Sequence, residues 1–295
     1  MNVLGFMGFG EAAPAIAEGL AEAGAKNLYT YDIAYQASPD RFAPRMARSG
    51  TKMTKNPAEL SSRCDLILSL VTCTEAVPAA ASITPHLTPD HVYVDMNSTS
   101  PAVKREVADI VEKSGARFVE AAVMSVVPPL RHKVPVLLCG KAAPALVSTL
   151  EPFGMNLEVL GEQIGAASAT KMFRSIMVKG MQALFIECLL AARHFGTEKR
   201  VLDTVTASYP GINWNEFADY LIGRSALHAG RQSHEMEEVS QTLESIGELP
   251  LMARATAERL RRFSELGFKE VFGDSEPDTY AEVLALLASR EKEKN

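Results

Sequence analysis

The residues with the clearest chemistry lie within the first 32 positions of this chain. Gly8-Phe9-Gly10-Glu11-Ala12-Ala13 fits G-x-G-x-x-G/A, a pattern typical of a turn that binds the pyrophosphate of a dinucleotide. Small residues are needed because Gly8 permits the tight turn, Gly10 lets a phosphate approach the backbone, and Ala13 lets the next helix pack closely. Asp32 lies 22 positions after Gly10, close to the ~20 expected for the acid that binds the adenosine ribose.

The segments around this motif favour a dinucleotide site over a glycine-rich turn without a ligand. Residues 1–7 predict a short apolar strand, 12–23 a helix that ends at Gly24, and 27–31 a second strand that leads into Asp32. A helix that begins at the turn directs its unpaired N–H groups toward the phosphates.

A second candidate for chemistry is Lys171. It lies near the start of a long predicted helix, among small and apolar residues, and Lys171, Ser175 and Lys179 share one face at i, i+4 and i+8. A partly desolvated lysine has a pKa lowered toward working pH and can act as a general acid or base. The spacing by itself favours the alternative, an ordinary solvated helix face.

Two kinds of segment must position these residues. In the first half, short apolar or β-branched runs alternate with helical stretches such as 101–114, which predicts a parallel sheet covered on both faces. After Gly161 the chain is helical, beginning with a proline-free segment at about 166–195 and continuing at 231–243 and 250–263. We expect an α/β Rossmann-type doubly wound domain at 1–162 and an all-α substrate and dimerisation domain at 163–295, joined by the long helix. The further strands are expected at 66–70, 91–96, 117–121, 134–138 and 156–160, and a solvated tail at 290–295.

Four segments in order resemble motifs of the β-hydroxyacid dehydrogenase family, which includes 3-hydroxyisobutyrate, tartronate-semialdehyde and 6-phosphogluconate dehydrogenases. They are Gly5–Gly10, Val94–Pro101, Phe118–Val126 and Gly165–Ser175. The resemblance implies that Lys171 is the catalytic general acid or base. It also implies two groups of binding residues. Those expected to bind substrate are Ser98, Met124, Ser125 and Ser175, and those expected to bind cofactor are Met7, Gly8, Phe9, Gly10, Glu11, Asp32, Leu70, Val71, Thr72 and Asn97.

The substrate segment departs from the family pattern. Met124-Ser125-Val126 replaces Ser-Gly-Gly, and Ser175 replaces an asparagine, so it offers one donor where an amide offers two. Asn97 replaces the first serine of a Ser-Thr pair. These changes indicate a bulkier or more apolar substrate, or a differently placed acid group. The basic residues at 131–133 are candidates for anion binding, with an exposed basic loop as the favoured alternative.

One further face stays open between two interpretations. Arg224, His228, Arg231, Glu235 and Glu238 share a face if one helix covers them, although Gly230 permits a break. A salt-bridged solvent or subunit face is at least as well supported there as substrate contact.

Composition limits the class of protein. The chain has 295 residues, 47% hydrophobic and 22% charged, with a net charge of −6, which argues against a nucleic-acid partner. We count no apolar run of the ~18–20 residues that a membrane span needs and see no signal-peptide pattern. We therefore expect a soluble cytoplasmic protein, and the long apolar helix with further helices behind it suggests a homodimer. Its four cysteines, at unrelated spacings, are expected to be buried free thiols, and its histidines form no metal motif.

Together these features predict an NAD(P)-dependent oxidoreductase that transfers hydride to or from a 3-hydroxyacid or a related hydroxy or carbonyl compound. Asp32 favours NAD, because it accepts from a ribose 2′-OH and repels a 2′-phosphate, while Arg41 and Arg45 keep NADP open. Two alternatives remain: imine-reductase-like activity on the same scaffold, against which Lys171 argues, and a dinucleotide-binding sensor without turnover.

Overall fold

The computed structural model describes residues 3–273 and 275–293, and divides the chain into two compact units, Met1–Lys171 and Met172–Asn295. The division falls inside the long helix α8 (Ala166–Arg193), somewhat later than the domain boundary expected after residue 162. Each unit has its own apolar core.

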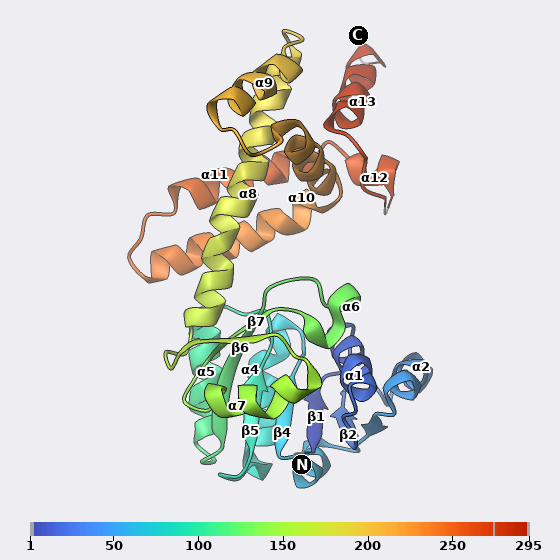
Figure 1. The fold of residues 1–295 in the computed structure, drawn as a ribbon, viewed down its shortest axis with the longest axis vertical. Helices are drawn as coiled ribbons and strands as arrows, with labels where there is room; N and C mark the ends of the chain where they lie inside the picture. Colours follow the sequence, from blue (N-terminus) through green and yellow to red (C-terminus); the bar gives the residue numbers. More distant parts are fainter. Residues whose placement is uncertain (1–2, 274, 294–295) are drawn as a thin grey trace. The chain divides into compact units, whose positions relative to one another are not determined.

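The first unit is built on one eight-stranded sheet in the order β3-β2-β1-β4-β5-β6-β7-β8 (Figure 1). The order reverses between β1 and β4, and at such a reversal an open α/β sheet binds ligands beyond the carboxyl ends of its strands. The predicted Rossmann-type sheet followed by long helices is confirmed. The strands are β1 (Leu4–Met7), β2 (Leu28–Tyr31), β3 (Lys52–Met53), β4 (Leu66–Ser69), β5 (Val92–Asp95), β6 (Arg117–Val123), β7 (Val136–Cys139) and β8 (Leu157–Gly161).

One strand corrects the expectation of an all-parallel sheet. β7 pairs antiparallel with β6, placing Cys139 opposite Glu120. The connection between them holds only the short helices α6 (Val127–Leu130) and η3 (Arg131–Lys133). A parallel return needs a crossover of a dozen or more residues, usually with a covering helix. This connection, Met124 to Pro135, is 12 residues, at the lower limit of that length, and its helices are too short to cover the sheet.

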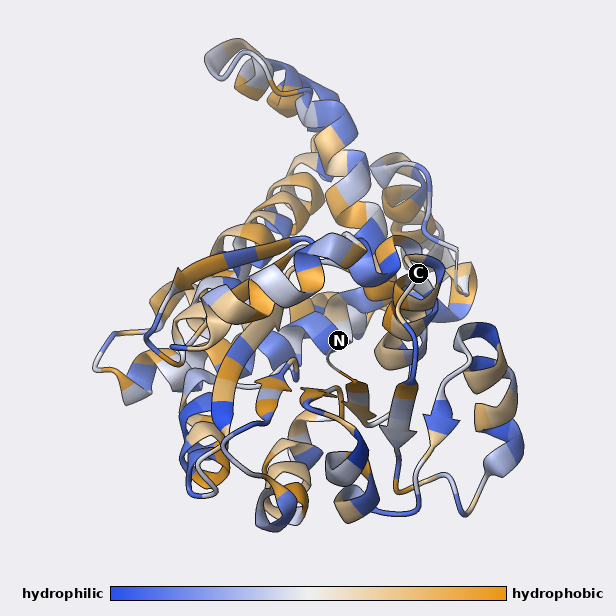
Figure 2. Ribbon diagram, turned by 60° about the horizontal axis from the view of Figure 1, so that its bottom comes forward, coloured by the Kyte–Doolittle hydropathy of each residue, from blue (hydrophilic) through white to orange (hydrophobic). Residues whose placement is uncertain are grey.

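Successive residues of the strands supply two different apolar clusters. Leu66 and Leu68 of β4 belong to one buried cluster and Ile67 to another, as the two-residue period of a strand requires. Helices that alternate hydrophobic and hydrophilic residues cover the sheet (Figure 2). They are α1 (Ala12–Glu22), α2 (Pro39–Ser49), α3 (Pro57–Arg63), α4 (Ala76–Ile83), α5 (Pro101–Glu112) and α7 (Ala143–Leu150), with short turns η1 (Cys73–Glu75), η2 (Thr84–His86) and η4 (Glu151–Phe153).

The prediction of an exposed basic loop at 131–133 is wrong for His132. This side chain is 5% exposed and packs against α1. A Cβ on Gly19 would lie 1.9 Å from His132 Nδ1, so only glycine leaves room for the ring. Arg131 makes a two-point ion pair with Glu22, at 2.7 Å for each contact, so its guanidinium anchors the loop to α1. Burial lowers the pKa of His132, and the nearby charges of Lys133 and Arg131 lower it further.

This pKa shift predicts a pH dependence of stability. The folded protein favours neutral His132, whereas the unfolded chain takes up a proton below about pH 6.5. The contribution of His132 to the free energy of unfolding is therefore present above about pH 6.5. It is lost as the pH falls through 6.5 toward the lower pKa of the folded state. Urea unfolding of His132→Gln at pH 7.5 and 5.0 should show a smaller loss of stability on acidification than the wild type. A loss equal to that of the exposed-site control His86→Gln would contradict this.

The second unit contains only helices within its described residues. α10 runs through Gly230 without a break, so a single helix does carry the charged face from Arg224 to Glu238. α13 continues to Glu293, where a tail was expected from residue 290; residues 294–295 of that tail lie outside the described residues. Besides α8, the helices are α9 (Glu198–Ser208), α10 (Trp214–Ser245), α11 (Leu251–Ser264), α12 (Phe268–Phe272) and α13 (Tyr280–Glu293).

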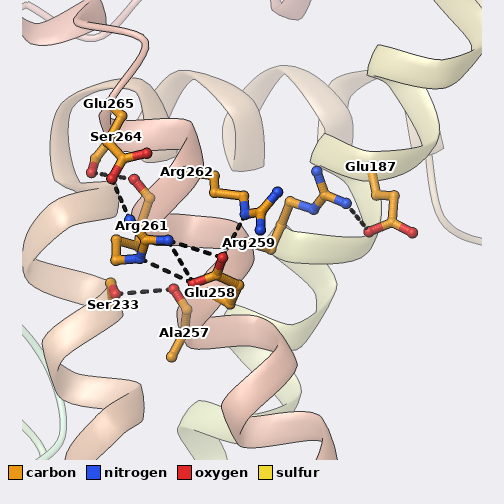
Figure 3. A network of polar contacts seen from close by, with 9 residues as sticks. All are labelled: Glu187, Ser233, Ala257, Glu258, Arg259, Arg261, Arg262, Ser264 and Glu265. Carbon is orange, nitrogen blue, oxygen red and sulfur yellow. Dashed lines mark hydrogen bonds and ion pairs between the residues drawn. The ribbon is translucent and has the colours of Figure 1, made fainter.

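The helix α11 shows how this unit divides apolar and charged faces. Its buried residues, such as Leu260 and Phe263, join the core of the second unit. Its exposed side carries ion pairs from Glu258 to Arg261 and Arg262 (Figure 3). Exposed pairs of this kind contribute little to stability individually, so the apolar face holds α11 in place.

Among the described residues, one helix has the length and composition of a membrane span. An 18-residue stretch of α8 has a mean hydropathy of 1.5, and 22% of that stretch is buried within the protein. The sequence shows no uninterrupted apolar run here, because charged residues such as Arg174 and Lys179 lie within α8. Core helices of soluble proteins can have the same length and mean hydropathy. Met177 and Leu184 are among its exposed apolar side chains, at 67% and 60%.

The cysteines are free, and they correct the expectation of buried thiols in part. Cys64 and Cys139 are buried, whereas Cys73 and Cys188 are exposed. Cys73 comes directly after the loop that follows β4, and Cys188 lies on α8, so an apolar sequence neighbourhood did not imply burial. Within residues 3–273 and 275–293, no group of three or more His, Cys, Asp or Glu is placed to hold a metal ion.

Candidate active site

The glycine-rich turn lies where the strand order reverses, between the ends of β1 and β4. Gly8 has φ +91°, and its N–H donates to Tyr31 O at 2.8 Å. A Cβ at this position would lie 2.6 Å from Leu70 O, so a larger residue would push β1 and β4 apart. A Cβ on Gly10 would meet nothing within 4 Å, which leaves open space above that backbone.

Asp32 lies beside this turn. Its carboxylate accepts hydrogen bonds from Phe9 N and Ala34 N, both at 2.8 Å. Arg45, on α2, folds back onto the turn and donates to Gly10 O at 2.7 Å. Its guanidinium therefore supports the turn from the carbonyl side, a role that the sequence did not indicate.

The residues around the turn fit a dinucleotide. Glu11, at the N-terminal boundary of α1, is exposed and makes no side-chain cap, so no side chain from that position competes for the first N–H groups of the helix. Met7 and Phe9 are 3% and 0% exposed, so their side chains belong to the core and only their backbone forms the turn. The open space at Gly10 suits a pyrophosphate, and Asp32 suits a ribose hydroxyl.

The loops after β4 and β5 continue this edge. Leu70 N donates to Met7 O at 2.8 Å, and Val71 N donates to the side-chain oxygen of Asn97 at 2.7 Å. The amide nitrogen of Asn97 donates to Ser69 Oγ at 3.0 Å, so this buried side chain joins the two loops. Thr72 is exposed at the end of the first loop. The structure thus brings the predicted cofactor residues from β1, β2, β4 and β5 to one edge.

Ser98 and Lys171 meet next to this edge. Ser98 follows Asn97 directly and is exposed, and Lys171 Nζ donates to Ser98 Oγ at 3.0 Å. Lys171 is half-buried in the second turn of α8. Two residues 73 positions apart are therefore in direct contact beside the predicted cofactor site.

The other predicted substrate residues are placed differently. Met124 is half-buried and packs against a small cluster that includes Cys139 and Ala167, while Ser125 is exposed after the end of β6. Ser175 lies one turn after Lys171 on α8, within the second unit, and accepts a hydrogen bond from Lys179 Nζ at 3.1 Å. Ser175 is thus engaged with its own helix.

Lys179 also forms an ion pair with Glu235 of α10, which Arg231 contacts as well. Burial raises the pKa of Glu235, but its contacts with Lys179 and Arg231 outweigh burial and hold that pKa below its usual range. Part of the charged face on α10 therefore forms ion pairs inside the second unit.

Three buried charged residues beneath the site were not predicted. Lys104 of α5 is 1% exposed, and its Nζ lies 3.2 Å from Asp95 Oδ1 and donates to Asp95 O at 2.8 Å. Burial lowers the pKa of the Lys104 ammonium, while the charge of Asp95 opposes that shift. Glu120 of β6, 0% exposed, accepts from Gly165 N and Ser168 N. A sequence signal did exist: Lys104 shares the apolar face of its helix with Val107 and Val111.

The fold and the turn together define a dinucleotide-binding protein with a Rossmann-type domain. Residues 3–143 match the family model for the NAD binding domain of 6-phosphogluconate dehydrogenase, and residues 192–263 match a domain of unknown function, DUF1932. The chain belongs to the superfamily of 6-phosphogluconate and 3-hydroxyacid dehydrogenases, in a divergent group that carries the DUF1932 domain. Its resemblance to that superfamily is thereby confirmed.

Solved structures agree with this membership. A conserved hypothetical protein from Sinorhizobium meliloti is 38% identical, with 98% of this chain and 97% of that chain covered and a TM-score of 0.87. The conserved protein MTH1747, of unknown function and described as structurally similar to 3-hydroxyacid dehydrogenases, is 30% identical, with 90% and 98% covered and a TM-score of 0.76. A 3-hydroxyisobutyrate dehydrogenase from Mycobacterium tuberculosis shares the fold at 16% identity, with 95% and 96% covered and a TM-score of 0.74.

Proposed function

We propose that the protein is an NAD(P)-dependent oxidoreductase that transfers hydride between the nicotinamide and the hydroxyl-bearing carbon of a 3-hydroxyacid or a related compound. The observation that carries this proposal is the contact of Lys171 Nζ with Ser98 Oγ, at 3.0 Å. Ser98 adjoins Asn97, whose side chain binds the loop that flanks Gly8. A proton-transfer group therefore lies next to the edge that suits a dinucleotide.

The chemistry divides between cofactor and protein. When bound, the nicotinamide supplies the hydride acceptor or donor. Neutral Lys171 takes the proton of the substrate hydroxyl during oxidation, and its ammonium returns a proton to the carbonyl oxygen during reduction. Ser98 hydrogen bonds to the lysine and orients it toward the same oxygen, while Ser125 and Ser175 are the further substrate residues that we propose.

The substrate that we propose has an apolar group near its reacting carbon. Met124 presents a half-buried thioether where the family pattern has serine, and Val126 is 57% exposed. Neither side chain donates a hydrogen bond to a carboxylate. These residues support a bulkier or more apolar hydroxyacid than those of the family's small-substrate enzymes.

The direct test is NADH and NADPH oxidation against a panel of semialdehydes, 3-oxoacids and cyclic imines. Turnover of a semialdehyde or 3-oxoacid would support the proposed function. A preference for cyclic imines would instead support imine-reductase-like activity. Tight dinucleotide binding without turnover of any compound would indicate a dinucleotide sensor rather than an enzyme.

We further propose that NAD is the preferred dinucleotide, and Asp32 provides the prediction. Asp32→Asn should weaken NAD binding about 10- to 100-fold, because a hydrogen bond to a charged group contributes about 1.5–3 kcal/mol. The same change removes the charge that repels a 2′-phosphate, so NADP binding should weaken less or improve. Calorimetric titration with each dinucleotide checks this, with the exposed α2 residue Asp40→Asn as the control. Equal loss of NAD and NADP affinity in Asp32→Asn would contradict a selective role.

A cytoplasmic homodimer is our proposal for the assembled protein. Its support is the apolar surface of α8, where Met177 and Leu184 are exposed in the single chain. Covering such side chains with a second copy would remove apolar area from water, which favours association. Small-molecule substrate and dinucleotide are the other partners that we propose, with neither nucleic acid nor membrane.

A further inference from the structure

Glu120 is a buried carboxylate that the proposed reaction does not use. It is 0% exposed on β6, in a run that is otherwise apolar. Its Oε2 accepts from Gly165 N at 2.5 Å and its Oε1 accepts from Ser168 N at 2.7 Å. One oxygen therefore binds the N–H of the residue just before α8 and the other binds an N–H of its first turn, where a negative charge also interacts favourably with the helix dipole.

The chain enters α8 through a glycine in the left-handed region. Gly165 has φ +101°, and a Cβ there would lie 2.9 Å from a guanidinium nitrogen of Arg105 and 3.2 Å from Cβ of Pro101. Ser168 closes the turn by donating its hydroxyl to Gly165 O at 3.1 Å. The start of α8 is thus fixed against both β6 and the first turn of α5.

Lys171 follows Ser168 by three residues, less than one helical turn. Asn97, which directly precedes its partner Ser98, is held from the other side, because Asp95 Oδ1 accepts from Asn97 N at 2.9 Å. Lys104 lies between the carboxylates of Asp95 and Glu120. It forms an ion pair with Asp95, and its Nζ donates to the carbonyl of Ala121, the residue after Glu120, at 3.5 Å. Buried carboxylates therefore fix both ends of the contact between Lys171 and Ser98.

We propose that Glu120 is a positioning residue, which caps α8 through both carboxylate oxygens and thereby holds Lys171 Nζ against Ser98 Oγ. The importance of this position for catalysis rests on the proposed function of Lys171. The position itself can be measured without turnover, because an amine held in a hydrogen bond reacts more slowly with acylating reagents than a mobile one.

The experiment measures the rate at which acetic anhydride acetylates Lys171 in the folded protein, at a series of pH values between 6 and 10. After labelling, the protein is digested and its peptides are quantified by mass spectrometry. Exposed Lys113 is the internal reference. Glu120→Gln replaces one acceptor by an NH₂ group that faces a backbone N–H, so at least one cap bond is lost. The rate at Lys171 relative to Lys113 should rise about fivefold, the effect of losing one helix cap. The pH midpoint at Lys171 should also shift. Glu120→Asp keeps the charge and should give a smaller increase.

The matched control is Glu158→Gln, at an exposed position of β8. Rates and midpoints at Lys171 that are the same in Glu120→Gln and in this control would overturn the proposal. If Glu120→Gln does not fold, judged by its melting transition, Glu120→Asp decides: a wild-type rate and midpoint at Lys171 would then overturn it.

Failure of the positioning role and failure of the proposed function give different results. If the acetylation rate of Lys171 changes in Glu120→Gln, but the wild-type protein turns over no substrate, the positioning role is supported and the proposed reaction is rejected. Where turnover is found, Glu120→Gln should lower kcat and leave KM for the dinucleotide unchanged, because the glycine-rich turn is not altered. If the acetylation rate of Lys171 is unchanged in Glu120→Gln and turnover is normal, the proposed reaction is supported and the positioning role is rejected.

Discussion

Replacing Lys171 by alanine is expected to lower turnover about 10²–10⁴-fold while dinucleotide affinity stays within about twofold of the wild type. The loss follows from removing the group that carries the substrate proton and that donates to Ser98 Oγ. Steady-state kinetics with the best substrate of the panel, together with calorimetric titration of NAD, check the two parts separately. Near wild-type turnover would eliminate Lys171 as the general acid or base.

Lys171→Arg separates proton transfer from charge. Arginine keeps the positive charge but cannot release a proton in the working pH range, so its turnover should stay as low as that of alanine. The exposed Lys141→Ala is the control and should behave as the wild type. A high kcat in Lys171→Arg would show that positive charge, rather than proton transfer, is what the site requires.

The largest expected effect on stability comes from Lys104. Lys104→Met leaves the buried carboxylate of Asp95 without an opposite charge and removes donors from the Asp95 and Ala121 carbonyls. Removing one partner of a buried pair typically costs about 3–5 kcal/mol. Urea unfolding should show that decrease in the free energy of unfolding, with an unchanged slope against urea concentration.

Two further variants make this result specific to the pair. Lys113→Met, at the exposed end of the same helix, should change stability by less than about 0.5 kcal/mol. Asp95→Asn combined with Lys104→Met removes both charges and should recover part of the loss. A double variant as unstable as Lys104→Met with Asp95 intact would mean that lost packing, not the unpaired carboxylate, is responsible.

Local patterns predicted much of this protein. The turn at Gly8–Gly10, the acid Asp32 and the long helix from Ala166 are each encoded in short segments, and the structure places the first two side by side. The family resemblance placed both Ser98 and Lys171 among the expected site residues, whereas spacing favoured a solvated lysine. Their direct contact across 73 positions is a finding of the structure. The resemblance thus grouped two distant residues that residue periodicity does not relate.

The remaining features depend on tertiary structure. In the sequence, Glu120 is a single charged residue within a predicted strand. Its two N–H partners, Gly165 and Ser168, lie at the start of α8 and come close to it only in the folded protein. β7 runs antiparallel to β6 because the 12-residue connection between them holds only short helices that cannot cover the sheet. The sequence shows the length of that connection, but not the absence of a crossover helix within it. His132 is buried because Gly19, more than 100 positions earlier, has no side chain. None of these pairs has a signature within a single segment.

The small cluster around Met124 has a consequence for changing substrate preference in the laboratory. Met124, from the loop expected to contact substrate, packs on the same apolar group as Ala167, which belongs to the first turn of the helix that carries Lys171. A larger or smaller residue at 124 therefore alters the support of the helix as well as the binding surface. Substitutions at 124 and 167 are expected to be strongly epistatic. Selection for a new substrate at this site is therefore expected to proceed through paired changes at 124 and 167.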